Sequence, residues 1–337
     1  MLRGRGDGRL PAGLVIVGLA ALLVALCAGR LSVGAMGFGG SGGFWTLIDL
    51  RGVTVMVAVV AGAGLAGSGV VLQAMLRNPL ASPWILGLSA GAGFGVTVEV
   101  WARESAFGVI DAGVGVGTPG AALAGAGGAL GIVYWLSRRR GLLDPVTMIL
   151  VGVMVSIVCG AGTMFVQQML PDRGFAAAGR WMMGSIDADT PWWRLGVAGL
   201  VVGLGLVVSW WVSRGVDALS VSDDEARSMG VPIGRLRAVL FVVASVMTAS
   251  AVVLAGPIGF VGLVCPHAAR LLVGPMNRVL LPAAALAGAS ALVGAELLSE
   301  VVRTDAGRVP EGVITALIGG PVFIWLLRRR PPGGGVG

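Results

Sequence analysis

The sequence predicts an all-α integral membrane protein with about ten transmembrane helices and both termini in the cytoplasm. Three observations predict this fold class: 56% of the 337 residues are hydrophobic, only 12% are charged, and the mean hydropathy is +0.90. About a quarter of the residues in a typical soluble domain are charged, and fewer polar side chains cannot cover a surface that faces water. The composition therefore excludes a soluble enzyme, a disordered chain and a disulfide-stapled secreted module.

Uncharged segments place the individual helices. A helix needs about 20 apolar residues to cross the hydrocarbon layer, so long runs without Asp, Glu, Arg or Lys mark candidate spans. Nine such runs occur, at 10–29, 52–76, 78–98, 112–136, 145–171, 195–213, 238–269, 279–295 and 312–327. The seventh run is too long for one helix and contains the helix-breaking sequence Ala-Gly-Pro-Ile-Gly at 255–259. Dividing it there gives ten spans.

The charges orient this bundle. With both termini inside, 16 of the 24 arginines fall in inner segments, whereas 11 of the 17 acidic residues fall in outer segments. We therefore predict a single domain over 1–337, with a cytoplasmic N-terminus (1–9), a helical bundle (10–327), a long inner loop (214–236) and a cytoplasmic tail (328–337). The first span resembles a signal peptide, but we interpret it as an uncleaved helix, because removing it would leave nine spans. The net charge of +7 is explained by membrane topology rather than by binding to nucleic acid.

The identity of the polar residues narrows the chemistry further. Every basic residue is an arginine, so a P-loop lysine, a Schiff-base lysine and a lysine general base are all excluded. The three cysteines lie in apolar stretches, which favours packing over disulfide bonds. The single histidine, His267, cannot form a multi-histidine metal site, and we predict no metal site. No residue is expected to perform covalent catalysis.

Four polar motifs interrupt the apolar chain and call for an explanation, because buried polar groups are costly in a membrane. The first is a turn at the inner face between the second and third spans. Its prolines break the helix, and an Asn before a Pro is a turn former. The turn is explained either as a tight connection or as a fixed contact surface for a partner. Its candidate residues are Gln73, Arg77, Asn78, Pro79, Leu80, Ala81 and Pro83.

The second motif lies in the long inner loop. Ser222 followed by Glu225 is a capping-box pattern, and Gly230 is suited to a helix C-terminus. The pattern predicts a short, well-capped helix that either docks to a cytoplasmic protein or serves only as a solvated connector. Its candidate residues are Val221, Ser222, Asp223, Asp224, Glu225, Ala226, Arg227, Ser228, Met229 and Gly230.

The third motif lies at the inner end of the eighth span and contains Gly262, Pro266, His267 and Arg270. These residues could form a proton relay, but a single His without an acidic companion favours an interfacial cap in which His267 and Arg270 anchor the helix end. In the fourth motif, Pro310 and Glu311 begin the final helix at the outer face.

The order and spacing of these motifs resemble the FecCD family of ABC-importer permeases, which take up ferric siderophores, haem and cobalamin. The resemblance extends from about residue 50 to the C-terminus. It implies a type II ABC importer permease of ten helices, a partner formed by a second copy of the chain, two cytoplasmic ATPase subunits that bind ATP and Mg²⁺, and an extracytoplasmic binding protein. By position, the resemblance makes 221–230 a coupling helix, 73–83 an Asn-Pro-Leu-Ala turn, and 262–270 a Gly-Leu-x-x-Pro-His-x-x-Arg signature.

The sequence also departs from the family pattern at the outer face. Members often carry two arginines around a proline before the second span, but here only Arg51 is kept, with Val53 and Thr54 in the other positions. An Ala-Asp-x-x-x-Arg pattern is replaced by one that contains Glu296 and ends in Glu300. We therefore expect the binding protein to dock on a rearranged set of charges. That set is Arg51, Arg303, Arg308 and Glu311.

Together these features predict a multi-pass permease of the cytoplasmic (inner) membrane that is not itself an enzyme. The expected substrate is a metal chelate, with a ferric siderophore ranked first and haem or cobalamin next. The alternative is a secondary transporter driven by an ion gradient, which predicts paired acidic residues or broken helices near the middle of the membrane.

Overall fold

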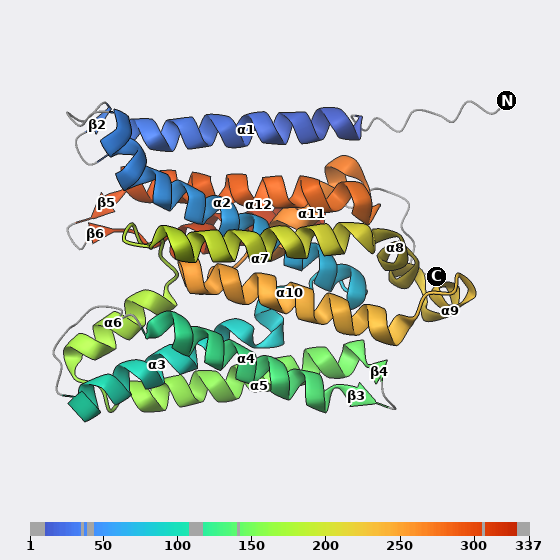
Figure 1. Cartoon of the computed structure of the whole chain (residues 1–337), viewed down its shortest axis with the longest axis horizontal. Helices are drawn as coiled ribbons and strands as arrows, with labels where there is room; N and C mark the ends of the chain where they lie inside the picture. The colour runs from blue at the N-terminus through green and yellow to red at the C-terminus, as the bar shows by residue number, and fades with distance from the viewer. Residues whose placement is uncertain are drawn as a thin grey trace.

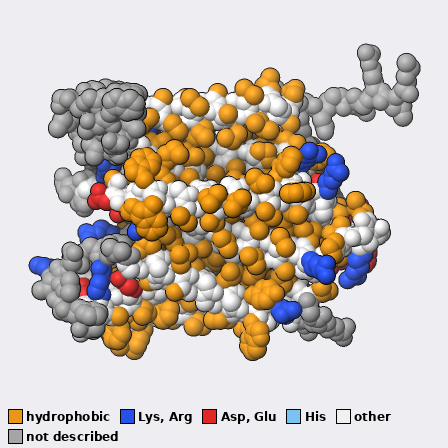
Figure 2. Space-filling view, in the orientation of Figure 1, with side chains coloured by type: hydrophobic (Ala, Val, Ile, Leu, Met, Phe, Trp, Pro, Cys, Tyr) orange, Lys and Arg blue, Asp and Glu red, His pale blue; other side chains and the backbone are white. Residues whose placement is uncertain are grey.

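A computed structural model describes residues 11–34, 37–38, 44–107, 117–139, 142–304 and 307–328. Within these ranges the chain forms thirteen α-helices, one short 3-10 helix and three two-stranded antiparallel hairpins. The long helices run side by side along one axis (Figure 1). Figure 2 shows a broad apolar surface over the middle of this bundle, with charged side chains gathered at its two ends. An apolar belt between two charged ends is the surface expected of a protein that crosses a bilayer.

Each of the ten predicted spans falls on a helix. These helices are α1 (Ala12–Ser32), α2 (Phe44–Met75), α3 (Leu88–Phe107), α4 (Thr118–Leu136), α5 (Pro145–Gln167), α7 (Trp192–Trp211), α10 (Ile233–Ala255), α11 (Val261–Val273), α12 (Asn277–Val301) and α13 (Glu311–Arg328). Seven of the helices in the described ranges are long and apolar enough to cross a membrane, and α3, α11 and α13 are shorter or more polar. The count of ten crossings stays a prediction.

The remaining elements are shorter and connect these helices. They are η1 (Pro83–Leu86), α6 (Asp172–Met182), α8 (Ser213–Val221), α9 (Asp223–Ser228), and the strand pairs β1 (Val33–Gly34) with β2 (Gly37–Phe38), β3 (Arg138–Arg139) with β4 (Leu142–Leu143), and β5 (Arg303–Thr304) with β6 (Gly307–Arg308). The start of α1 lies at the same end as α8, α9, β3 and β4, and α6, β2, β5 and β6 lie at the opposite end (Figure 1). We call the first the cytoplasmic end, following the arginine distribution, and the second the outer end.

Helix α2 is the centre of the bundle. In its apolar window 78% of the residues are buried, compared with 6% in α1 at the periphery, and α2 packs against α12, α10, α11 and α7. Small residues permit the closest crossings: a Cβ at Gly62 would collide with the backbone of Gly288, and a Cβ at Gly69 would collide with that of Gly262. Such backbone contacts are typical of helix packing in membranes.

The third span differs from its predicted position. The sequence predicted a span at 78–98, but α3 begins at Leu88 because a turn and the 3-10 helix η1 occupy the residues before it. Gly87 has φ +78°, a left-handed conformation that glycine adopts readily, and it directs the chain into α3. The helix then continues nine residues beyond the predicted end at 98, to Phe107, and carries the pair Arg103–Glu99 (3.4 Å) near its outer end.

The predicted division of the seventh run is confirmed. Helix α10 ends at Ala255 and α11 begins at Val261, and between them Gly256 and Phe260 both have positive φ, at +67° and +65°. The start of α11 lies beside the middle of α2, because Gly262 packs against Leu65 and Gly69. Non-helical backbone at such a depth is tolerated where it is buried in protein or lines a cavity.

Candidate functional site

The short helix α9 forms as the sequence predicted, with its cap in place. The Ser222 hydroxyl accepts a hydrogen bond from the Glu225 backbone N–H at 3.0 Å, and acidic residues occupy the first turn. Gly230 ends the helix with φ +76°. Ala226 is fully buried, whereas Val221 and Met229 are exposed at either end of the helix. α9 is therefore held on one side and presents both apolar and charged side chains on the other.

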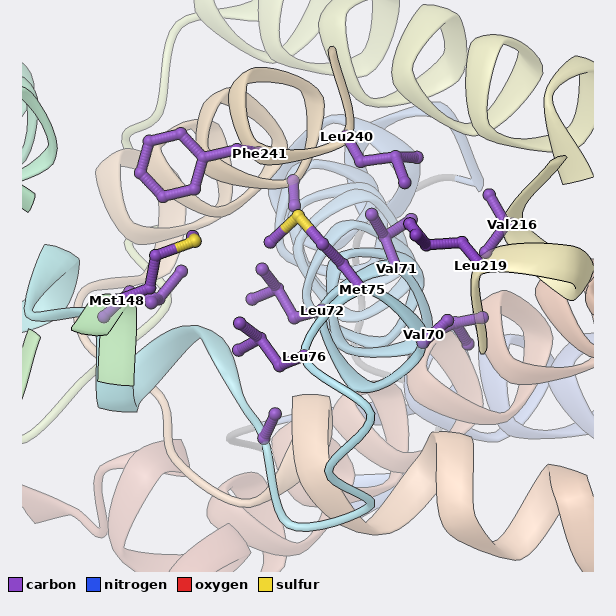
Figure 3. Packing of buried hydrophobic residues seen from close by; sticks show 14 of the residues in the cluster. Val70, Val71, Leu72, Met75, Leu76, Met148, Val216, Leu219, Leu240 and Phe241 are labelled. Carbon is purple, nitrogen blue, oxygen red and sulfur yellow. The ribbon is translucent and has the colours of Figure 1, made fainter. Parts of the chain in front are cut away.

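The preceding helix, α8, fixes α9 to the bundle. Val216 and Leu219 of α8 pack into the main core cluster with Val71 and Met75 of α2 and Leu240 of α10, as Figure 3 shows. This cluster lies at the cytoplasmic end of α2. A displacement of α8 and α9 would therefore act directly on the central helix.

One carboxylate joins α9 to two other elements. Asp223 forms an ion pair with Arg77 at the end of α2, and the same oxygen of Asp223 accepts a bond from Arg237 of α10 at 2.9 Å. Arg77 also donates to the Leu219 carbonyl at 2.8 Å, and Arg237 donates to the Leu143 carbonyl at 3.4 Å. We call Arg77, Asp223 and Arg237 the inner cluster.

The electrostatics of the inner cluster favour a charged Asp223. Partial burial of this carboxyl acts to raise its pKa, but Arg77 and Arg237 outweigh that effect and hold the pKa below its usual value. The cluster is therefore intact at neutral pH and weakens only in acid.

The Asn-Pro-Leu-Ala turn leads directly away from Arg77. Arg77 has φ +49°, and the Asn78 side chain accepts a bond from the Leu80 N–H at 2.9 Å, which closes an Asx turn. Ala81 is fully buried and Leu80 is exposed. Pro83 opens η1 and packs against Gly262 of the third motif. The turn is thus both a rigid connection and a partly exposed surface.

The third motif contacts the first motif, and its two polar side chains contact different helices. His267 faces the ring of Phe323 in α13, with the ring centroids 5.9 Å apart. Arg270 instead donates to the Gln73 side chain at 3.2 Å. The predicted interfacial cap, in which His267 and Arg270 anchor the helix end, stays a prediction; the two side chains contact α13 and α2 respectively. Pro266 packs against Gly69.

The residues expected to dock the binding protein have different environments. Arg308 pairs with Glu300 at 2.7 Å and stays partly exposed, and Arg51 donates to the Leu31 carbonyl at 2.7 Å. The Glu311 side chain is only 3% exposed and accepts a bond from the Ile186 N–H at 2.9 Å, so it is removed from the predicted docking surface. The side chain of Arg303 lies outside the described part of the structure.

The sequence interpretation missed two buried arginines. Arg30 pairs with Glu296 at 2.8 Å and Glu300 at 3.4 Å, and Arg237 completes the inner cluster. Both lie next to or within an apolar run, which is the signal that could have identified them, because a buried charge in a membrane protein normally has a partner.

An apolar cleft lies beside the break between α10 and α11. Its volume is about 640 Å³. It is lined by Leu80 and Trp84 after the Asn-Pro-Leu-Ala turn, by Phe260, by Met183 at the end of α6 and by Leu317 of α13. Trp84, Met183 and Leu317 are all substantially exposed. The irregular backbone at 256–260 therefore lines a cavity, as expected at membrane depth.

A multi-pass bundle with a cleft beside a broken helix and a capped helix at its cytoplasmic end defines a membrane transport protein. The chain belongs to the FecCD transport family, whose model matches residues 13–329. It is the permease subunit of an ABC importer and a multi-pass protein of the inner membrane. The family therefore favours the importer over the alternative of a transporter driven by an ion gradient.

Known proteins with similar sequences and structures agree with this assignment. The chain is 40% identical to a cobalamin import system permease protein from Halobacterium salinarum, over 82% of this chain and 71% of that protein. It is 31% identical to a hemin transport system permease protein from Yersinia pestis, over 98% of both chains. A solved inward-facing structure of a metal-chelate type ABC transporter superposes with a TM-score of 0.81 and 28% identity, covering 95% of this chain and 100% of that one.

Proposed function

We propose that the permease imports a metal chelate of the cobalamin class, with haem and a ferric siderophore as the next candidates. This order reverses the sequence-based ranking, which placed a siderophore first. The proposal is supported by the 40% identity to a cobalamin permease, which exceeds the 31% identity to a hemin permease.

The apolar cleft carries the functional proposal. A second copy of the chain covers it, and the substrate passes between the two copies. Support comes from the exposed apolar side chains of Trp84, Met183 and Leu317, which line the cleft. An exposed apolar surface beside irregular backbone is favoured as a subunit contact and transport path rather than as a lipid-facing surface.

Two ATPase subunits, which bind ATP and Mg²⁺, dock at the cytoplasmic end. The exposed surface of α9 supports this part of the proposal, because Asp224, Arg227 and Met229 project from a helix that Asp223 ties to α2 and α10. Closure of the ATPases moves α9, and the inner cluster transmits that movement to α2 and α10.

The extracytoplasmic binding protein docks at the outer end. Arg51 and Arg308 are the described members of the docking set, and Arg303 completes it as a sequence-based expectation. Reversing these charges singly should weaken the association, and more so at low salt. Unchanged affinity at every salt concentration would count against this surface.

The decisive experiment is uptake by the reconstituted importer. The permease is placed in liposomes with its ATPase and binding protein, and uptake of labelled cobalamin, haem and a ferric siderophore is measured with ATP inside the vesicles. We expect ATP-dependent accumulation of cobalamin that a collapse of ion gradients leaves intact. Uptake of haem or siderophore alone would overturn the substrate, and uptake abolished by ionophores without any need for ATP would overturn the mechanism.

A further inference from the structure

A small pocket with both polar and apolar lining lies at the cytoplasmic end, where the ends of α2 and α8 meet the turn from α11 to α12. Its volume is about 230 Å³, and it shares no lining residue with the apolar cleft. Its principal lining residues are Gln73, Arg77, Ser220, Arg270, Pro275 and Asn277. Two guanidinium groups therefore border the same pocket.

The first of these charges is only partly neutralised. Asp223 is the carboxylate that pairs with Arg77, but the same oxygen also serves Arg237. One negative charge is thus shared between two arginines. Asp217, the nearby acid on α8, directs its Oδ1 to Asn277, which donates to it through both its backbone N–H (2.9 Å) and its side-chain amide (2.6 Å).

The second charge has no acidic partner among the described residues. Arg270 donates one bond to the neutral oxygen of Gln73, and its Nε atom is buried without a hydrogen-bond partner. Arg270 lies in the last turn of α11, where the helix dipole offsets part of its charge. A dipole does not satisfy a buried N–H donor, however, and such a donor is costly to leave unpaired.

We propose that this pocket binds a phosphate-class oxyanion between Arg77 and Arg270. Guanidinium groups recognise phosphate oxygens through paired hydrogen bonds, and both Arg77 and Arg270 line this pocket. A water molecule takes about 30 Å³ in the liquid, so the space accommodates a phosphate group with several waters. The proposal does not depend on the substrate of the importer.

The location allows two sources for this anion. Basic pockets between transmembrane helices on the cytoplasmic side are suited to the headgroups of anionic lipids, and the same geometry accepts free inorganic phosphate. The phosphate chemistry is common to both, and two arms of one experiment separate them.

The first arm titrates inorganic phosphate into the delipidated full-length chain in detergent, with ionic strength held constant by sodium chloride. We expect a saturable rise in the midpoint of thermal unfolding, because a ligand that binds only the folded state stabilises it. Arg270→Gln should weaken the apparent affinity at least about tenfold, since it removes charge-assisted bonds. Arg270→Lys, which keeps the charge without the planar fork, should retain an intermediate response.

Arg278→Gln is the matched control. Arg278 lies at the same end of the protein, but its guanidinium stacks on Trp210, with 4.8 Å to the ring centroid, and it does not line the pocket. This variant should respond to phosphate as the original chain does. A loss of response equal to that of Arg270→Gln would show a general surface effect and overturn the proposal.

The second arm uses native mass spectrometry on protein released from nanodiscs of phosphatidylglycerol or phosphatidylcholine. Retention of phosphatidylglycerol that Arg270→Gln abolishes would assign the site to a lipid headgroup, whereas a phosphate response without lipid retention would assign it to the free anion. The absence of both signals in the original chain, or signals that Arg270→Gln leaves unchanged, would overturn the proposal.

Discussion

The two ends of the molecule use the same types of charged residue in opposite ways. At the outer end, Arg30, Glu296, Glu300 and Arg308 form a cluster with two bases and two acids, and the side chains of Arg30 and Glu296 are only 2% and 1% exposed. In the inner cluster one carboxylate, Asp223, serves two arginines and is 29% exposed. The outer cluster has equal numbers of acids and bases, is largely buried, and joins α1 to α12. The inner cluster has one acid for two bases, is partly exposed, and connects α9 to the rest of the bundle.

The outer cluster also explains a departure from the family pattern. Where members carry an arginine, this chain has Glu300, which would leave two acids unpaired on α12. Arg30 of α1 and Arg308 of β6 supply the missing positive charge from other elements. The charge balance is therefore preserved although the charge at position 300 has the opposite sign.

The largest effect should follow from removing the base of the buried outer cluster. Arg30→Met leaves Glu296 and Glu300 buried with only the rim residue Arg308, and we expect destabilisation of about 3–5 kcal/mol. Thermal unfolding in detergent measures it. The variant that adds Glu296→Leu to Arg30→Met should recover part of the loss. If Arg30→Met alone leaves stability unchanged, the outer cluster does not stabilise the packing of α1 against α12.

A smaller loss of stability is expected from the inner cluster. Asp223→Asn removes the carboxylate between Arg77 and Arg237, and we expect about 1–3 kcal/mol, because Arg237 is buried and keeps only a neutral partner. ATP-driven uptake should fall more steeply than stability does. Asp224→Asn, one residue away on an exposed side chain, is the control for stability. If uptake falls only in proportion to the loss of stability, the inner cluster has no separate role in coupling.

The pH dependence of stability provides a separate test of the inner cluster. The pKa of Asp223 is lowered in the folded protein, so its contribution is complete above the unfolded value of about 3.9 and is lost as the pH falls through the lower folded value. The stability difference between the original chain and Asp223→Asn should therefore stay constant from pH 7 to about 5 and shrink in stronger acid. A difference that grows on acidification would show that the sign of the shift is wrong.

The smallest effect on stability is expected at the exposed surface of α9. Asp224 and Arg227 form an ion pair at 3.3 Å, and the Asp224 side chain is 93% exposed, so replacing both by Ala should cost less than about 1 kcal/mol. Co-purification with the ATPase should nevertheless fall, because the docking surface has changed. Normal assembly and normal uptake in this double variant would remove α9 from the coupling assignment.

Much of this architecture could be predicted from local sequence. The apolar runs located ten helices, the Pro and Gly residues at 255–259 located the break, and the Ser222 and Gly230 pattern located α9. The start of α3 could not be placed in this way, because the run at 78–98 contains no charge, although its first residues form a turn and a 3-10 helix. Hydropathy counts apolar residues but does not register how prolines arrange the backbone.

The sequence by itself determined the membrane location and the motifs of the family, because these depend on composition and short-range spacing. Only the tertiary structure decided which charges meet. Arg30 lies more than 260 residues from Glu296, and Gln73 lies 197 residues from Arg270, so no local pattern could pair them. The structure also buried Glu311, placed His267 against Phe323 and paired Arg270 with Gln73. Burial makes each unpaired charge costly, and long-range packing alone decides which partner lies within reach.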